Sequence, residues 1–117
     1  MINAIVNELD ETLAALADPT RRQVVDLLRV RPRAAGELAA GSGTSRPAMS
    51  RHLRTLRTTG LIEQDPGGGD ARIRRYRLRR DRFAALQAWL DQVEAFWTEQ
   101  LGSFKAHAER TRGGPHT

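Results

Sequence analysis

The sequence predicts one mostly helical domain with a small β-hairpin: four helices come before the hairpin and one long helix follows it. Three observations predict this fold class. Apolar residues recur at spacings of three and four along most of the chain, which is the period of amphipathic helices. A glycine-rich stretch, residues 66–70, separates two short strand-like segments. The length of 117 residues suits one hydrophobic core rather than two.

Two amphipathic helices are expected at the start of the chain. Five apolar residues repeat every three or four positions and predict a helix that runs to about residue 17: Ile2, Ile5, Leu9, Leu13 and Leu16. Asp18 followed by Pro19 signals a second helix, because the Asp side chain can accept a free backbone N–H and proline suits the first turn. This helix is expected to reach about Arg29. Its buried face would contain Val24, Val25 and Leu28.

A pair of helices joined by a tight turn is expected next. The third helix lies near residues 35–40, and residues 41–44 are expected to form the turn, since two glycines and two β-substituted polar residues disfavour a helix. Thr44 or Ser45 caps the fourth helix, which ends at Gly60. One face of that helix is apolar and contains Met49, Leu53 and Leu56. The other face is polar and basic and contains Arg46, Ser50, Arg51, Arg54 and Arg57.

The hairpin and the last helix complete the predicted order. Residues 61–64 and 73–78 are the expected strands, with Tyr76 and Leu78 toward the core and Arg75 and Arg77 toward solvent, because side chains alternate along a strand. A helix from about residue 81 to 108 follows. Its nearly continuous apolar seam contains Phe83, Leu86, Leu90, Val93, Trp97, Leu101, Phe104 and Ala108. We expect one domain over residues 1–109 and a disordered tail over residues 110–117.

The distribution of charge indicates a polyanionic partner. The formal net charge is +5, and residues 44–82 carry 11 arginines against four acidic residues, whereas residues 1–20 carry four acidic residues and no basic one. All but one of the 19 basic residues are arginine, whose planar fork suits phosphate and guanine edges. A solvated basic surface is the alternative that charge alone leaves open.

Several other classes of protein are disfavoured. The absence of cysteine excludes disulfides, thiolate nucleophiles and zinc ribbons. No stretch approaches the roughly 18 apolar residues of a membrane-spanning helix, and no secretory signal is evident, so a cytoplasmic protein with no membrane partner is expected. Ser50 and His52 diverge on a helix and no acid orients the imidazole, so there is no catalytic triad. Gly41 and Gly43 lack the strand and third glycine of a dinucleotide site. The sequence therefore predicts no enzyme.

The predicted order of elements is that of a winged helix-turn-helix. Two helices are joined by a tight turn, the second helix has a basic face, and an arginine-rimmed hairpin follows it. The chain resembles the ArsR/SmtB family of bacterial winged-helix repressors over nearly its whole length. The resemblance lies in residues 16–22, 36–38, 45–56 and 60–62. It implies a homodimeric DNA-binding repressor with the helix from Ser45 in the major groove and the hairpin beside it.

Candidate DNA contacts follow from this placement. Residues near the start of a recognition helix lie closest to base edges, so Arg46, Pro47, Ser50 and Arg51 are the base-reading candidates. Thr44 and Arg54 are expected at phosphates, and Ser45 at the helix start is a further DNA-binding candidate. In the hairpin, the candidates for phosphates or the minor groove are Arg72, Arg74 and Arg75. Arg21 and Arg22 are expected either to pair with the acidic first helix or to contact phosphate. His52 is interpreted as a hydrogen-bonded structural residue.

The last helix predicts a homodimer. Its 28 or so residues would extend about 42 Å, longer than a domain of this size is wide, so its own chain cannot cover the whole apolar seam. A second copy would cover the rest through the first and last helices. The interface candidates are Ile2, Ile5, Leu9, Trp89, Val93, Phe96, Trp97, Leu101 and Phe104.

No metal ion or other cofactor is expected. The resemblance implies that thiolate sensors of the family carry cysteines where this chain has Ala34 and Gly36, and that other sensors place histidines and carboxylates on the final helix. Here that helix holds one histidine, His107. If an effector exists, a small apolar molecule beside the aromatic residues of the last helix is favoured over an ion, and a repressor without a ligand is equally allowed.

The sequence is compatible with three functions. The leading one is a dimeric repressor that binds a palindromic operator near its own promoter. Repression and the position near its own promoter are what the family resemblance implies. The second is a protein-interaction module that uses Glu94, Phe96, Trp97 and Phe104 on the last helix. The third is nonspecific architectural binding of DNA, with a steep salt dependence and little sequence preference. Binding to random and to promoter DNA separates the three.

Overall fold

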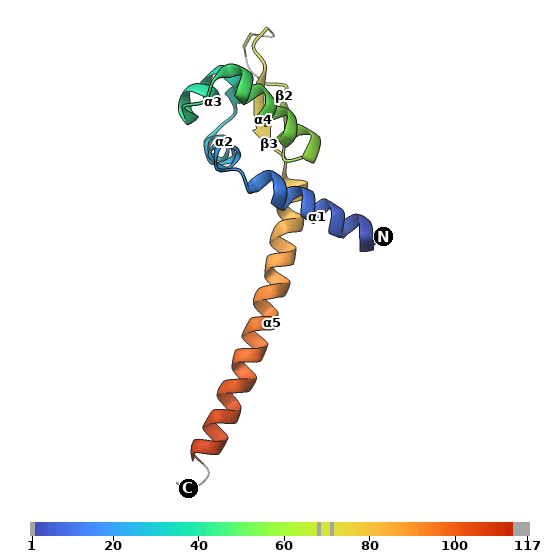
Figure 1. Cartoon of the computed structure of the whole chain (residues 1–117), viewed down its shortest axis with the longest axis vertical. Helices are drawn as coiled ribbons and strands as arrows, with labels where there is room; N and C mark the ends of the chain where they lie inside the picture. Colours follow the sequence, from blue (N-terminus) through green and yellow to red (C-terminus); the bar gives the residue numbers. More distant parts are fainter. Residues whose placement is uncertain (1, 68, 71, 114–117) are drawn as a thin grey trace. The chain divides into compact units, whose positions relative to one another are not determined.

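The computed structural model describes residues 2–67, 69–70 and 72–113 (Figure 1). Within that range, the side chains of residues 2–6, 103–104, 106–107 and 109–113 are not described. The chain divides into a unit of residues 1–85 and a unit of residues 86–117, and each is described by itself.

The order of elements confirms the predicted mostly helical fold class with a small β component. The described chain contains α1 (Ile2–Leu16), α2 (Pro19–Val30), β1 (Arg33–Ala34), α3 (Ala35–Ser42), α4 (Arg46–Thr59), β2 (Ile62–Asp65), β3 (Arg75–Leu78) and α5 (Arg80–Gly113). Helices α1 to α4, the sheet and the first turns of α5 belong to the first unit, and the rest of α5 forms the second.

The sheet has three strands rather than the two that the sequence predicts. Its order is β1-β3-β2 and all pairs are antiparallel, so β3 is the central strand. Tyr76 of β3 lies opposite Arg33 on one side and Gln64 on the other. Strand β1 is only two residues long, too short for an alternation of polar and apolar side chains to be recognised.

The core of the first unit gathers side chains from α2, α3, α4 and β2. The largest fully buried apolar residues are Leu38, Met49, Leu56, Leu61, Ile62 and Val24. The predicted apolar face of α4 is confirmed, since Met49, Leu53 and Leu56 are all buried. In α2, Val24 and Leu28 are buried, whereas Val25 is only half-buried.

Small residues of α1 face this core together with Leu16, which is partly buried against it. Thr12 and Ala15 are almost completely buried, and the Thr12 hydroxyl donates to the carbonyl oxygen of Glu8 at 2.9 Å. Leu9 is half-buried and Leu13 is 41% exposed. Among the described side chains of the apolar stripe that predicted this helix, Leu13 is therefore left exposed by the first unit.

The predicted turn at residues 41–44 is shorter than expected, because Gly41 and Ser42 belong to α3. A Cβ added at Gly41 would lie 3.0 Å from Cδ1 of Leu27, so this glycine permits close packing of α3 on α2 rather than a turn. The Ser42 hydroxyl donates to the Leu38 carbonyl at 2.7 Å, as in a helix interior. The chain reverses at Gly43, whose φ of 65° favours glycine.

The last helix is longer than predicted. It begins at Arg80 and continues to Gly113, so residues 110–113 are helical instead of part of a disordered tail. Thr111 and Arg112 are compatible with a helix, and the strong helix breakers begin only at Gly113. The remainder of the expected tail, residues 114–117, lies outside the described residues. Within the described ranges, no helix has the length and apolar character needed to cross a membrane.

Candidate nucleic-acid interface

Helix α4 begins at a well-formed cap, which sets the position of its first turn. Ser45 has extended backbone angles and its hydroxyl oxygen accepts the backbone N–H of Ala48 at 3.3 Å. Pro47 lies in the first turn, and Gly60, with φ of 84°, ends the helix. Of the two capping residues that the sequence allows, Ser45 is the cap. Thr44 lies in the turn before it and donates to the Ser42 carbonyl at 3.5 Å.

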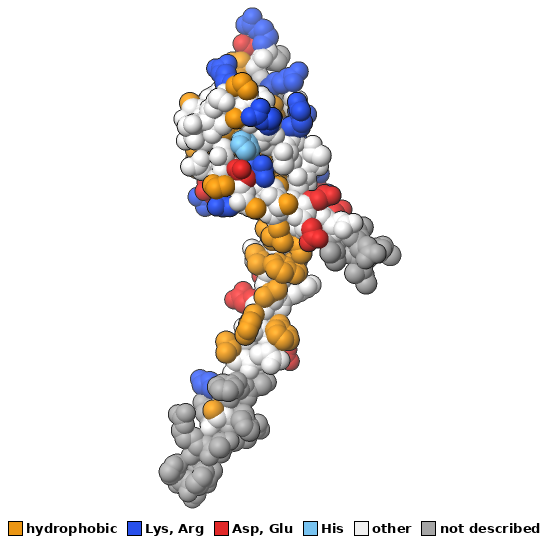
Figure 2. All heavy atoms as spheres, in the orientation of Figure 1, with side chains coloured by type: hydrophobic (Ala, Val, Ile, Leu, Met, Phe, Trp, Pro, Cys, Tyr) orange, Lys and Arg blue, Asp and Glu red, His pale blue; other side chains and the backbone are white. Residues whose placement is uncertain are grey.

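The two faces of α4 separate core from solvent as predicted. While the apolar face is buried, the side chains of Arg46, Pro47, Ser50, Arg51 and Arg54 are exposed. Figure 2 shows basic side chains gathered over the part of the first unit that contains α4 and the hairpin. A rigid helix that presents hydrogen-bond donors on its solvent face has the chemistry needed to read base edges in a major groove.

Arg46 lies against the helix that precedes it. A Cβ added at Gly36 of α3 would lie 3.0 Å from Nη2 of Arg46, so the guanidinium rests close against the backbone of Gly36. The first turn of α4 thus approaches the start of α3 through the Arg46 side chain. Arg46 remains exposed despite the contact.

A cleft of about 260 Å³ lies between α4 and the hairpin and brings candidate residues from both elements together. Its walls include Ser50 and Arg54 of α4 and Arg74 beside β3. Arg57 also lines it, and its guanidinium carbon lies 6.0 Å from the ring centroid of Tyr76, within range of a cation–π interaction. The sequence places Arg57 on the exposed face of the helix, but no DNA contact was predicted for it. Its spacing of three residues from Arg54 puts both side chains on the same face and could have indicated a shared role.

The arginines of the hairpin divide into free and neutralised groups. Arg72 forms an ion pair with Asp70 at 3.2 Å, and its hydrogen bonds to that carboxylate hold the pKa of Asp70 below its usual value. Arg77 pairs with Glu63 and Asp65 of the neighbouring strand at 3.1 and 3.4 Å.

Arg74 and Arg75 form no ion pair within the part of the chain that the structure describes. Of the three hairpin candidates, the structure thus brings Arg74 to the α4 cleft, while Arg75 is half-buried on β3 and Arg72 is occupied by Asp70.

Arg21 and Arg22 contact the first helix through its backbone carbonyl groups rather than through its acidic side chains. Arg21 Nε donates to the Ala15 carbonyl at 2.6 Å, and Arg22 Nη1 donates to the Leu16 and Ala17 carbonyls at 2.8 and 3.0 Å. Both side chains therefore cap the last turn of α1, where carbonyl groups lack helical partners. The expected ion pairs with acidic side chains of α1 do not form among the described residues, because the connection between α1 and α2 is short enough to bring these carbonyls within reach. A phosphate contact by Arg21 or Arg22 stays a prediction.

His52 is confirmed as a hydrogen-bonded structural residue, since its Nδ1 lies 3.3 Å from Arg21 Nη1. Nearby, Asp18 caps α2 by accepting the backbone N–H of Arg21 at 3.1 Å. That hydrogen bond, followed by the charge of Arg21, holds the pKa of the Asp18 carboxyl below its usual value.

The second unit presents large apolar side chains to solvent. Phe96, Trp97 and Leu101 are 57%, 58% and 62% exposed, and the rings of Phe96 and Trp97 meet edge to face at 6.4 Å. Trp89 is exposed and Val93 is half-buried. The side chains of Ile2, Ile5 and Phe104, three of the predicted interface residues, lie outside the described residues.

Comparisons with known proteins agree with this geometry. Residues 16–65 match the model of a helix-turn-helix domain. The chain is 42% identical over 95 residues to the HTH-type transcriptional regulator Rv2034 of Mycobacterium tuberculosis, and the match covers 81% of this chain and 83% of that protein.

Two solved structures extend the likeness to the fold. The ArsR-like transcriptional regulator from Rhodococcus sp. RHA1 is 30% identical, with a TM-score of 0.70 over 88% of this chain and 94% of that one. The homodimeric winged helix-turn-helix DNA-binding domain of Mb0332 from Mycobacterium bovis is 25% identical, with a TM-score of 0.61 over 85% of this chain and 86% of that one.

The exposed basic face of α4, the hairpin beside it and these relatives identify a DNA-binding regulator and not an enzyme. The chain belongs to the ArsR/SmtB family of winged-helix transcriptional regulators.

Proposed function

We propose that the protein is a homodimeric repressor that inserts α4 into the major groove of an inverted-repeat operator. The observation that carries this proposal is the exposed row of Ser50, Arg51 and Arg54 on a helix whose opposite face is buried. Arg46, Pro47, Ser50 and Arg51 read bases near the start of the helix. Thr44 and Arg54 contact phosphates, and Ser45 lies with them at the DNA surface. Arg72, Arg74 and Arg75 contact phosphates or the minor groove, and Arg72 exchanges Asp70 for the DNA when it does so.

Exposed apolar residues of α5 support the homodimer. An uncovered group of large apolar side chains on one helix marks a surface that another protein covers. The relative described as a homodimer has the same fold. A twofold axis would present two copies of α4 to successive major grooves about 34 Å apart, and the operator would then be palindromic.

Repression would follow from the position of the operator. A dimer bound over a promoter excludes RNA polymerase from the same DNA, and an operator that overlaps the protein's own promoter makes the regulation autogenous. If a ligand releases the DNA, a small apolar molecule beside Trp89, Phe96 and Trp97 suits the exposed aromatic surface of α5.

Footprinting on the DNA upstream of the gene, combined with binding to random duplexes, tests the proposal. We expect a protected inverted repeat, and Arg51→Ala should cost about 1–3 kcal/mol on that site while random DNA is bound nearly as before. Lys105→Ala is the matched control, because Lys105 is an exposed cation of the second unit. Equal affinity for all sequences would instead support architectural binding, and absence of DNA binding would support the protein-interaction module.

A further inference from the structure

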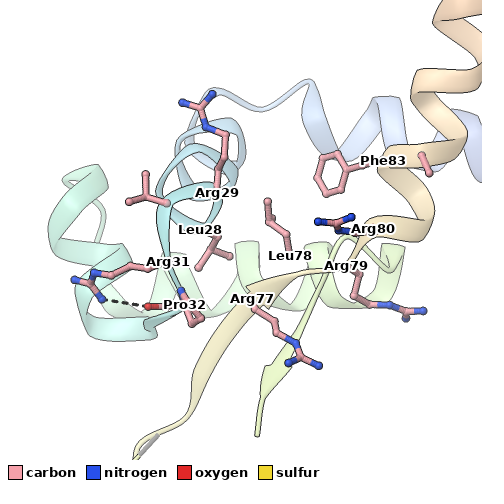
Figure 3. A pocket seen from close by; sticks show the side chains of 11 residues that line it. Leu28, Arg29, Arg31, Pro32, Arg77, Leu78, Arg79, Arg80 and Phe83 are labelled. Atoms are coloured by element: carbon pink, nitrogen blue, oxygen red, sulfur yellow. Dashed lines mark hydrogen bonds between the residues drawn. The ribbon is translucent and has the colours of Figure 1, made fainter. Parts of the chain in front are cut away.

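A second concave surface of the first unit lies apart from α4. This groove, with a volume of about 610 Å³, is formed by the end of α2, the segment that leads to β1, the end of β3 and the first turn of α5. No residue of α4 lines it. Figure 3 shows Leu28, Leu78 and Phe83 turned toward the same space from α2, β3 and α5.

The floor of the groove is apolar. Leu28 is buried, and Leu78 and Phe83 are partly buried against the same core. Val30 and Pro32 extend this apolar surface, and Val30 is 72% exposed. A groove of this size with apolar walls and a few polar groups at its margin has the character of a small-molecule site.

The margin of the groove is strongly and uniformly positive. Five of its lining residues are arginines, and none of the lining residues in the described chain is acidic: the arginines are Arg29, Arg31, Arg77, Arg79 and Arg80. Three of the five form ion pairs with carboxylates that do not line the groove. Arg31 pairs with Glu37, Arg77 with Glu63 and Asp65, and Arg79 with Asp81.

The other two, Arg29 and Arg80, carry charges that remain uncompensated. Both are exposed, and neither forms an ion pair with any residue that the structure describes. An occupant that carries a negative group would supply the missing partner. An occupant with an apolar body would cover Val30, Leu78 and Phe83.

We propose that this groove binds an organic anion with an apolar body, of the class of medium-chain carboxylates. The carboxylate pairs with Arg29 or Arg80, and the hydrocarbon chain lies on Val30, Leu78 and Phe83. This site goes beyond the proposed function, because neither its residues nor its ligand are those of the DNA-binding surface.

Calorimetric titration of the full chain with sodium octanoate, in the absence of DNA, tests the site. We expect saturable binding of one octanoate per chain, and much weaker binding of acetate, which lacks the apolar body, and of 1-octanol, which lacks the charge. Arg29→Gln and Arg80→Gln together should weaken octanoate binding by about tenfold or more. Because both side chains are exposed, the double variant should fold normally, which circular dichroism checks.

Arg51→Gln with Arg54→Gln is the matched control, since it removes two exposed charges from α4 instead. Octanoate binding that is unaffected by the groove variant, or reduced equally by the α4 variant, would overturn the proposal. A third outcome would also overturn the proposal: the protein does not bind octanoate, and the groove variant lowers DNA affinity as much as the α4 variant does. The groove would then be a DNA contact. Failure of octanoate binding would not contradict the proposed repressor function. Failure of DNA binding would not contradict the proposed anion site in the groove.

Discussion

Arg21 Nη1 lies 3.3 Å from Nδ1 of His52, a residue 31 positions further along the chain. A guanidinium group has only donors, so Nδ1 is the acceptor in a hydrogen bond between these two groups. The same Arg21 side chain donates to the Ala15 and Ala14 carbonyls at the end of α1. One arginine at the start of α2 therefore connects the end of α1 to α4.

Arg21→Ala should lower the free energy of unfolding by about 1–3 kcal/mol, because it leaves part-buried carbonyls and the His52 ring without their charged donor. Urea unfolding followed by circular dichroism measures this change. Arg22→Ala removes a similar cap at an exposed position and should cost less. A loss for Arg22→Ala equal to that for Arg21→Ala would show that the contact with His52 contributes nothing.

Acid should destabilise the protein partly through Asp18. The pKa of this carboxyl is lowered in the folded protein, so its contribution to stability is complete above its ordinary pKa of about 4 and is lost as the pH falls through the lower folded value. Asp18→Asn retains a capping oxygen that does not titrate in this range. The variant should therefore lose less stability than the parent between about pH 5 and pH 2 in unfolding titrations. Glu37 and Asp70, whose pKa values are also lowered, titrate in both proteins, and identical losses would contradict the prediction.

Gly36→Ala should change DNA recognition more than stability. The added methyl group would meet the end of the Arg46 side chain, which can move aside, while alanine in a helix is favoured over glycine by up to about 1 kcal/mol. We expect unchanged or higher thermal stability and a severalfold weaker binding to the specific operator. The effect on DNA should vanish in an Arg46→Ala background, and a similar loss in both backgrounds would show that Gly36 acts through something other than Arg46.

Arg57 and Arg74 should act as phosphate contacts without sequence preference. Each substitution to alanine is expected to weaken binding to specific and random DNA alike and to reduce the slope of log affinity against log salt by about 1. Tyr76→Phe keeps the aromatic face beneath Arg57 and should leave binding nearly unchanged. A loss confined to the specific operator would place Arg57 or Arg74 at bases instead.

Trp97→Glu should separate the dimer. A buried aromatic residue at the centre of an interface contributes about 2 kcal/mol or more, so the dimer dissociation constant should rise at least about thirtyfold, as measured by sedimentation equilibrium. Glu99→Gln is the control, because Glu99 lies with Asp91 and Glu94 on a polar side of the same helix. A parent protein that sediments as a folded monomer at micromolar concentration would contradict the dimer itself.

Local patterns in the sequence determined the elements and the exposed face of α4. The spacing of Met49, Leu53 and Leu56 specifies which side of that helix is buried, because only one face of a 3.6-residue period can meet the core. Ser45 and Gly60 specify its ends through cap chemistry that involves only neighbouring residues. The exposed arginines on the other face follow from the same period, so the candidate DNA-reading residues were readable without a structure.

Tertiary structure alone decided the features in which distant segments meet. Gly41 lies in a segment whose composition predicts a turn, but it packs against Leu27 within α3. Strand β1 forms because β3 lies beside it and pairs with it. The partners of Arg21, the position of Arg57 over Tyr76 and the arginine-rimmed groove likewise join residues far apart in sequence. Periodicity and capping describe energies between neighbours along the chain, whereas these contacts depend on packing that forms only when the helices and the sheet come together.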